Sequence, residues 1–322
     1  MPNNRRPPLL VTHGGSFHLD DAFAYAVLRL GLGLGKAAGD HSLVRTRDAA
    51  IIERADIVWD VGAVHDPAAG RFDHHQRGAP VREDATPFSA AGLIWQHHGK
   101  AAVAALLGPS GGAALAAAVA AEIDHEVVRR IDGIDNGTGP PGDVLGLDSM
   151  VADCNPAWDS GAVGDQAAED AAFRLTAELA RGFLQRRVEA IRARITADTV
   201  VVSAHARSVD PHILELDRKI PWEAGVFAHD LPVLFAIYPV PNGNWMVDSM
   251  PSELGSFAQR LPLPKAWAGL RDAELAAVSG VADAIFVHVR RFVGAAKSRE
   301  GAMELAQRAI TPHCNPIGTT SD

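Results

Sequence analysis

The first third of the chain alternates short apolar runs with longer amphipathic segments. The runs at residues 9–13, 42–48 and 55–64 are short and rich in β-branched residues, which predicts β-strands. Between the first two, apolar residues recur at helical spacing over residues 20–32, which predicts a helix. Strand–helix alternation is typical of an α/β domain with a mostly parallel, doubly wound sheet.

Helical patterns dominate the middle of the chain. Residues 89–107 and 111–131 are mostly apolar and have the length of helices, and Ser89 is a suitable N-cap for the first. A stretch rich in Gly and Pro over residues 135–165 interrupts the pattern. Helical spacing then returns over residues 165–195, which predicts one long helix.

Strand patterns dominate the last part of the chain. We expect strands at residues 199–205, 212–217, 231–240 and 244–250. Such a concentration of strands predicts a separate, smaller α+β domain, joined to the first by the long helix. We therefore predict a first domain over residues 1–160, and a linker helix with a second domain over residues 161–322.

Composition places the chain among ordinary globular proteins. It has 322 residues, of which 47% are hydrophobic and 21% charged, enough for two domains. Cys154 and Cys314 form neither a disulfide framework nor a metal-binding spacing, which suits a reducing compartment. The apolar runs are too short to span a membrane, so we expect a cytoplasmic protein without membrane contact. A net charge of −9 argues against general nucleic-acid coating but permits a local basic groove, and a homodimer stays open.

Histidines and aspartates gather where predicted strands and one helix end. The candidates are His13, His18, Asp20, Asp60, Asp73, His74, His75, Asp132 and Asp135. Carboxyl ends of strands in a doubly wound sheet form a ligand crevice, so we expect these side chains to meet there. Imidazoles and carboxylates without thiolates suit Mn²⁺, the ion we expect, and also Mg²⁺, Co²⁺ or Zn²⁺. The candidates suffice for two ions about 4 Å apart that share a carboxylate, and Asp60 is the natural bridge.

Each candidate also has a structural alternative. His13 could be a solvated histidine at a strand end, and Asp60 a turn residue. Asp20 and Asp21 could serve the N-terminus of the predicted helix, where the helix dipole favours acids. Asp135 precedes Asn-Gly and could form a turn. The conjunction of so many candidates favours a metal site; His97 and His98, by contrast, are expected in the last turn of a helix, with a structural role.

The motifs resemble a known family. "DHH" at residues 73–75, after a strand-borne Asp and an upstream His/Asp cluster, is similar to the DHH phosphoesterases, which include RecJ-type exonucleases and family II pyrophosphatases. The closer resemblance is to the Myg subfamily of metal-dependent hydrolases, whose eukaryotic members look like 3′–5′ RNA exonucleases. It extends over nearly the whole chain and includes "THGGSFHLDDAFA", "VWDVGAVHDPAAGRFDHHQRG", "IDGIDNG", "NPAWD" and "SGVADAIFVHVRRFVGAAKSREGAMELA".

The resemblance implies roles for individual residues. It implies one metal ion held by His13, His18 and Asp60, and a second held by Asp20, Asp60, His74 and Asp135. His75 would either support the metal ligands or face the phosphate, and Asp73 would orient its neighbours, both as part of the catalytic site. Asp135 matches the family's "D-N-G" step better than Asp132 does. One departure is His18, which stands where most relatives have Asp and so lowers the negative charge of the site.

The resemblance also implies a substrate-binding segment at residues 286–301. Its candidates are Arg290, Arg291, Gly294, Lys297 and Arg299, because cations and a glycine turn suit phosphate. The alternative is a strand–turn–helix with a solvated basic face.

The candidate ligands predict a two-metal phosphodiester hydrolase, and the resemblance implies a 3′–5′ exonuclease that acts on RNA or short oligonucleotides. A small-molecule phosphoesterase acting on pyrophosphate or a dinucleotide, a non-catalytic metal-binding protein and a scaffold remain open as alternatives.

Overall fold

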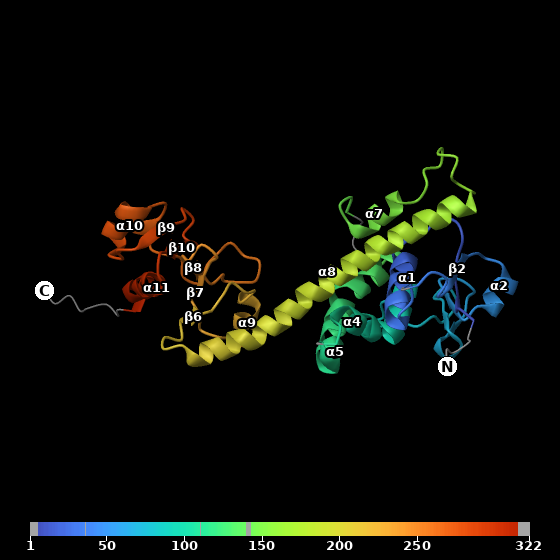
Figure 1. Cartoon of the computed structure of the whole chain (residues 1–322), viewed down its shortest axis with the longest axis horizontal. Helices are drawn as coiled ribbons and strands as arrows, with labels where there is room; N and C mark the ends of the chain where they lie inside the picture. The colour runs from blue at the N-terminus through green and yellow to red at the C-terminus, as the bar shows by residue number, and fades with distance from the viewer. Residues whose placement is uncertain (1–5, 36, 110, 140–142, 315–322) are drawn as a thin grey trace. The chain divides into compact units, whose positions relative to one another are not determined.

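The computed structural model describes residues 6–314 except 36, 110 and 140–142 (Figure 1). The chain divides into two compact units, Met1–Arg192 and Ala193–Asp322. The boundary falls inside helix α8 (Gln166–Arg207), so this helix belongs partly to each unit. The predicted division at residue 160 instead assigned the whole helix to the second domain.

The first unit is built on a five-stranded sheet, as the strand–helix alternation predicts. Its strands follow the order β2-β1-β3-β5-β4, and all neighbours are parallel except β4 and β5. The strands are β1 (Leu9–Thr12), β2 (Ser42–Arg45), β3 (Ile57–Trp59), β4 (His65–Asp66) and β5 (Arg71–Phe72). The predicted doubly wound, mostly parallel sheet is therefore confirmed.

Helices cover both faces of this sheet. On one face, α2 (Ala49–Arg54) packs Ile51 and Ile52 against Val11 and Val58. Trp59 alternates with Val58 along β3 and so points to the opposite face, where its indole stacks on Tyr25 of α1 (Leu19–Leu32). The sheet is thus enclosed by α1 and α2, as in doubly wound folds.

Two long helical segments continue the first unit, each interrupted by a π-helical turn. The first consists of α3 (Ala90–Ile94), the π-turn Trp95–Gly99 and α4 (Lys100–Leu107); the second of α5 (Gly112–Ile123), the π-turn Asp124–Val128 and α6 (Arg129–Asp135). A short helix, α7 (Leu147–Asp153), precedes α8, and a 3₁₀ turn spans Pro67–Ala69. The predicted N-cap is confirmed, because the Ser89 hydroxyl accepts the Gly92 N–H.

The placement of His97 and His98 differs from the expectation. They lie in the π-turn in the middle of a helical segment, not in its last turn, and both rings contact Phe72. The prediction of a helix end here was wrong because the glycine after them, Gly99, does not end the helix. Gly99 is buried against the ring of Trp95 and keeps helical backbone angles.

The second unit is a mixed sheet between two helical layers. Its strand order is β6-β7-β8-β10-β9, with β6 parallel to β7 and the other neighbours antiparallel. The strands are β6 (Ile213–Glu215), β7 (Phe235–Pro239), β8 (Trp245–Ser249), β9 (Ala284–Val287) and β10 (Val293–Ala296). One core lies between the sheet and helices α10 (Asp272–Ser279) and α11 (Arg299–Cys314). The other contains α9 (Glu223–Ala228) and the end of α8, and a 3₁₀ turn spans Lys265–Trp267.

The strand predicted at residues 199–205 is wrong, because α8 continues through it to Arg207. The run of β-branched residues in this segment is typical of a strand and led to the wrong prediction. Burial here follows helical spacing, since Ala197, Val201 and Ala204 are buried at intervals of three and four residues. Val202, which a strand would alternate with Val201, is 39% exposed. Packing against the second sheet thus overrides strand propensity.

No helix in the described part of the chain is both long enough and apolar enough to cross a membrane. The longest of them, α8, bears charged residues along its whole length.

Candidate metal centre

His13 begins the site directly after β1. It is 4% exposed, and its Nδ1 lies 3.2 Å from the Gly14 carbonyl oxygen. Its Nε2 faces two carboxylates, 3.0 Å from Asp21 Oδ2 and 3.2 Å from Asp60 Oδ2. A neutral imidazole that donates Nδ1–H to a carbonyl presents only a lone pair to these oxygens. A positive charge, either a proton or a metal ion, is therefore needed between these acceptors.

The loop that carries His18 is fixed from two sides. The carboxamide of Asn155 accepts the Phe17 N–H and donates to the Phe17 carbonyl, both at 2.9 Å. On the other side, the buried guanidinium of Arg45 donates to the Gly15 carbonyl and lies over the ring of Phe17. These contacts hold His18 at the N-cap of α1.

The first turn of α1 places two buried acids beside His13. The Asp21 carboxylate accepts the His18 N–H at 3.0 Å and so caps the helix, which is the structural role considered for it. Asp20 is 1% exposed, and neither of its carboxylate oxygens has a hydrogen-bond donor in the described part of the chain. A buried carboxylate without a donor is costly, so Asp20 is suited to bind a cation.

Asp60 lies at the centre of the cluster. It follows β3 in the left-handed backbone region, with φ 55°, which Asp and Asn tolerate better than other non-glycine residues. Its Oδ2 faces His13, while its Oδ1 is 3.2 Å from His74 Nε2 and 3.8 Å from His75 Nδ1. Asp60 therefore occupies a turn position, as its structural alternative expected, and it also lies at the centre of the cluster.

Asp73 organises the segment after β5. Its carboxylate accepts the backbone N–H groups of Ala63, His74 and His75, at 2.5, 2.7 and 3.2 Å. The same carboxylate lies 2.7 Å from His75 Nδ1. His74 is turned inward towards Asp60, whereas the His75 side chain is 61% exposed. Asp73 therefore fixes the backbone of this segment and the orientation of the His75 ring.

Asp132 and Asp135, three residues apart on α6, have different surroundings. Asp132 is fully buried and accepts Arg82 Nε at 2.6 Å and the Ser89 hydroxyl at 2.7 Å. Asp135 lies beside the cluster instead, with Oδ2 3.4 Å from His74 Nε2. The structure thus brings Asp135, and not Asp132, to the histidines.

The predicted ligands form three groups that could hold a metal ion. The groups are His13–His18–Asp60, His18–Asp20–Asp135 and Asp60–Asp73–His74–His75, and within each the ligand atoms lie within 4.8 Å of one another. The first group matches the set expected for one ion. The residues expected for the second ion are divided between the other two groups, and Asp60 belongs to two groups.

The pKa values of the cluster residues reflect both their burial and the charges of their neighbours. Burial acts to lower the pKa of His13, but its contacts with Asp21 and Asp60 prevail and raise it to about 10. Burial acts to raise the pKa of Asp60, but His13 and His74 hold it well below its usual range. Burial, together with the charges of Asp60 and Asp135, raises the pKa of Asp20 well above its ordinary value. The cluster therefore retains protons that a bound cation would displace.

The basic segment is not gathered into one patch. Arg290 and Arg291 lie in the turn before β10, whereas Lys297 and Arg299 follow the strand, roughly 13 Å further along at 3.3 Å per residue. Arg291 donates to the Leu263 carbonyl and Arg299 pairs with Glu215. Gly294 lies inside the sheet, where an added Cβ would meet the Phe286 carbonyl oxygen at 3.0 Å. Close packing therefore explains this glycine, and a substrate role of the segment stays a prediction.

Three residues around the cluster were not predicted to contact it or to support it. The Asp21 contact with His13 could have been suspected from its spacing to His18, which is that of a capping box. Asn155 lies in the "NPAWD" motif, but no local pattern indicates its partner. Arg82 reaches Asp132 and Asp124 across a loop, again without a signal in the sequence.

Fold and cluster together define the class: a two-unit α/β protein with a histidine–aspartate centre that could hold metal ions. The sequence model of the family MYG1_exonuc, described as "Uncharacterised protein family (UPF0160)", matches residues 9–310. The chain belongs to this MYG1 exonuclease family.

Individual relatives are similar over nearly their whole length. The chain is 36% identical to the human "MYG1 exonuclease", over 94% of this chain and 86% of that protein. Identity is 35% to the bovine "MYG1 exonuclease", over 97% and 88%. The identity to the "MYG1 protein" of Dictyostelium discoideum is 31%, over 94% of this chain and 96% of that protein.

Proposed function

We propose that this chain is a metal-dependent phosphodiester hydrolase, a 3′–5′ exonuclease that acts on RNA or short oligonucleotides. Membership of a family whose mammalian members are named exonucleases supports a nuclease. The observation that carries the metal dependence is Asp20. Its two buried carboxylate oxygens lack a donor while three further acids, Asp21, Asp60 and Asp135, lie around it.

The donor set fits two divalent ions, and we propose that both are Mn²⁺. His13, His18 and Asp60 would hold one ion, and Asp20, His74 and Asp135 would complete the other around Asp60. When bound, such ions supply positive charge for the phosphate oxygens and make the attacking water more acidic.

The protein's own contribution centres on His75. Asp73 accepts the Nδ1–H of His75, which fixes the tautomer and leaves Nε2 directed away from that carboxylate. Because the His75 side chain is 61% exposed, its Nε2 is accessible to a phosphodiester bound at the candidate metal centre. In protonated form it can donate a hydrogen bond to a phosphate oxygen or a proton to the leaving alkoxide.

Exposed cations of the second unit would contribute to binding the phosphates of the oligonucleotide. Arg290 and Lys297 are exposed, and Arg291 retains donors besides its bond to Leu263. Losing these cations should weaken oligonucleotide binding and flatten its dependence on salt.

The test follows 5′-labelled RNA and DNA of one sequence with purified protein and Mn²⁺. We expect products that shorten stepwise from the 3′ end, with RNA cut faster. Metal content should be two ions per chain. Absence of cleavage with ions bound would leave a non-catalytic metal-binding protein, the alternative stated above.

Two variants separate the exonuclease from a small-molecule phosphoesterase. In His74→Ala, kcat should fall on both RNA and bis-p-nitrophenyl phosphate, because the lost group acts at the reacting phosphate. In a triple Ala variant of Arg290, Arg291 and Lys297, the loss on RNA should exceed the loss on the small diester. Equal losses on both substrates would favour the small-molecule enzyme.

A further inference from the structure

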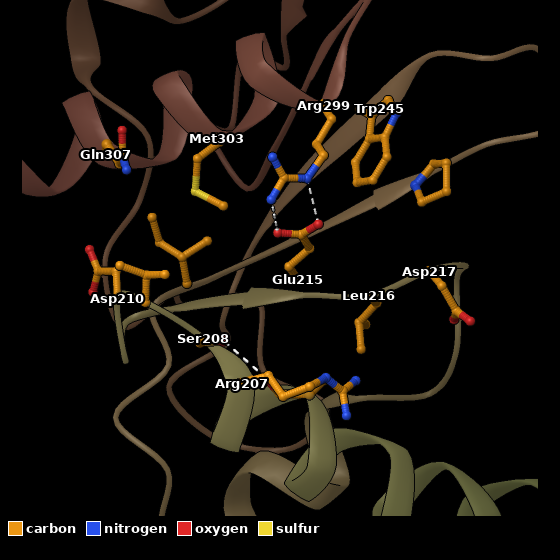
Figure 2. Close-up of a pocket in the computed structure, with 14 residues that line it drawn as sticks. Arg207, Ser208, Asp210, Glu215, Leu216, Asp217, Trp245, Arg299, Met303 and Gln307 are labelled. Carbon is orange, nitrogen blue, oxygen red and sulfur yellow. Dashed lines mark hydrogen bonds and ion pairs between the residues drawn. The ribbon is translucent and has the colours of Figure 1, made fainter.

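A pocket of about 780 Å³ lies wholly within the second unit, and none of its lining residues is a candidate metal ligand. Figure 2 shows it between the end of α8, the edge strand β6 and the first turns of α11. Its walls are partly apolar, with Ile213, Leu216, Pro239 and Met303 lining it. The volume is within the range of small-molecule binding sites.

An ion pair lies open at the centre of this pocket. Arg299 Nε and Nη2 donate to the two carboxylate oxygens of Glu215, at 2.6 and 2.5 Å. The side chains are 45% and 35% exposed, so the pair adds little to stability. Arg299 Nη1 forms a longer ion pair with a Glu300 oxygen, at 3.6 Å and thus beyond hydrogen-bond distance. The pair thus presents donors next to carboxylate lone pairs.

The charge of the lining argues against phosphate as the group that enters. Two cations, Arg207 and Arg299, face three carboxylates, Glu215, Asp210 and Asp217. A phosphate placed among them would meet more like charge than opposite charge. A neutral ring with adjacent donors and acceptors would instead satisfy the open edge of the pair.

The remaining requirement for a planar ligand is a stacking surface, and Trp245 provides it. This half-buried residue begins β8, and Figure 2 shows its indole beside the Arg299–Glu215 pair. Four other tryptophans, Trp59, Trp95, Trp222 and Trp267, are buried. Arg207 is exposed at the end of α8, lies across the pocket in this view, and has no ion-pair partner in the described part of the chain.

We infer that this pocket binds a nucleobase of a single-stranded oligonucleotide. The base stacks on Trp245 and hydrogen-bonds through its edge to Arg299 and Glu215, while Arg207 lies near the adjoining phosphate. The inference rests on the proposed function and adds to it a base-recognising subsite. It also gives Arg299 a role different from the phosphate contact expected from the sequence.

The experiment compares two ligands on the full, Mn²⁺-loaded chain. One is a short phosphorothioate RNA, which resists cleavage, and the other is the same backbone without bases. Wild type should bind the base-bearing ligand more tightly. Trp245→Ala should weaken that ligand roughly 5- to 150-fold, the range for loss of one stacked base, and leave the abasic ligand unchanged. Equal binding of both ligands to wild type would overturn the inference.

Matched variants show whether a loss of binding comes from misfolding. Trp158→Ala removes a tryptophan that is 89% exposed in the first unit and should change neither affinity. Trp245→Phe keeps a smaller ring and should give an intermediate affinity. Glu215→Gln keeps the shape but breaks the ion pair, so it should weaken only the base-bearing ligand. If Trp245→Phe and Glu215→Gln fold correctly and bind both ligands as wild type does, the pocket is not a base site.

The proposed function is judged separately, by wild-type cleavage of unmodified RNA. Cleavage of RNA together with equal binding of the base-bearing and abasic ligands would contradict the base subsite but support the exonuclease function. Base-dependent binding without cleavage would support the subsite and remove the exonuclease.

Discussion

Asn155 and Phe17 are joined by two hydrogen bonds, although 138 residues separate them in the chain. The carboxamide of Asn155 matches the backbone of Phe17 as a donor–acceptor pair. Since Phe17 precedes His18, this contact fixes the loop that carries a candidate ligand.

We expect Asn155→Ala to weaken Mn²⁺ binding by roughly tenfold, because groups that orient a ligand contribute on this scale. Isothermal titration with Mn²⁺ measures the change. Asn242→Ala is the control, since it removes a comparable bond from a side chain to the backbone, in a turn of the second unit. Equal affinity in both variants would show that the loop holds its shape without Asn155.

Asp60 allows a substitution that separates its backbone role from its charge. Asp60→Asn keeps a residue that tolerates φ 55° but removes the charge shared by two ligand groups. Hydrolysis should be abolished while the fold persists. Asp60→Ala should lose hydrolysis too and be less stable than the Asn variant by about 1 kcal/mol, from left-handed strain. Urea unfolding and RNA cleavage together test this; substantial cleavage by the Asn variant would reduce Asp60 to a turn residue.

The two acids of α6 should give opposite phenotypes. Asp132→Asn weakens a buried contact with Arg82, so it should cost about 3 kcal/mol of unfolding free energy with little change in metal affinity. Asp135→Asn should lower metal affinity with little change in stability. Urea unfolding of the metal-free protein and Mn²⁺ titration distinguish them. The reverse pattern would make Asp132 the ligand.

Metal binding should depend steeply on pH. The folded pKa of His13 is raised to about 10 from an ordinary 6.5, so its stabilising contribution is complete below pH 6.5 and disappears as pH rises to about 10. The metal-free protein should therefore lose stability over this window, while apparent Mn²⁺ affinity rises because fewer protons must be displaced.

Thermal unfolding and Mn²⁺ titration across pH measure both trends. His13→Gln should reduce both pH slopes. Unchanged slopes in this variant would assign the protons to other groups.

Much of the first unit could be predicted, because its strands are short buried runs between amphipathic helices. The cluster was predictable for a topological reason: His13 and Asp60 follow neighbouring parallel strands and so must lie at one edge of the sheet. The second unit was predicted less well. At residues 199–205 a β-branched run belongs to a helix, and only its packing against the sheet shows this.

The supports of the site could not be predicted. Asn155 reaches Phe17 across 138 residues, and Arg82 reaches Asp132 across 50. Periodicity reports which face of an element is apolar, but it contains no information about such pairings. The role of Asp21 was ambiguous for another reason, since capping the helix and contacting His13 demand the same residue type.

Helix α8 also determines how the chain can be divided in the laboratory. Phe173, on its first half, packs against the rings of Phe17 and Tyr25, and Glu178 pairs with Arg29. A fragment that stopped at residue 160 would expose these rings and loosen the loop before His18. A fragment that continues through residue 192 keeps them, so we expect the isolated first unit to bind Mn²⁺ only if it includes its own portion of the shared helix.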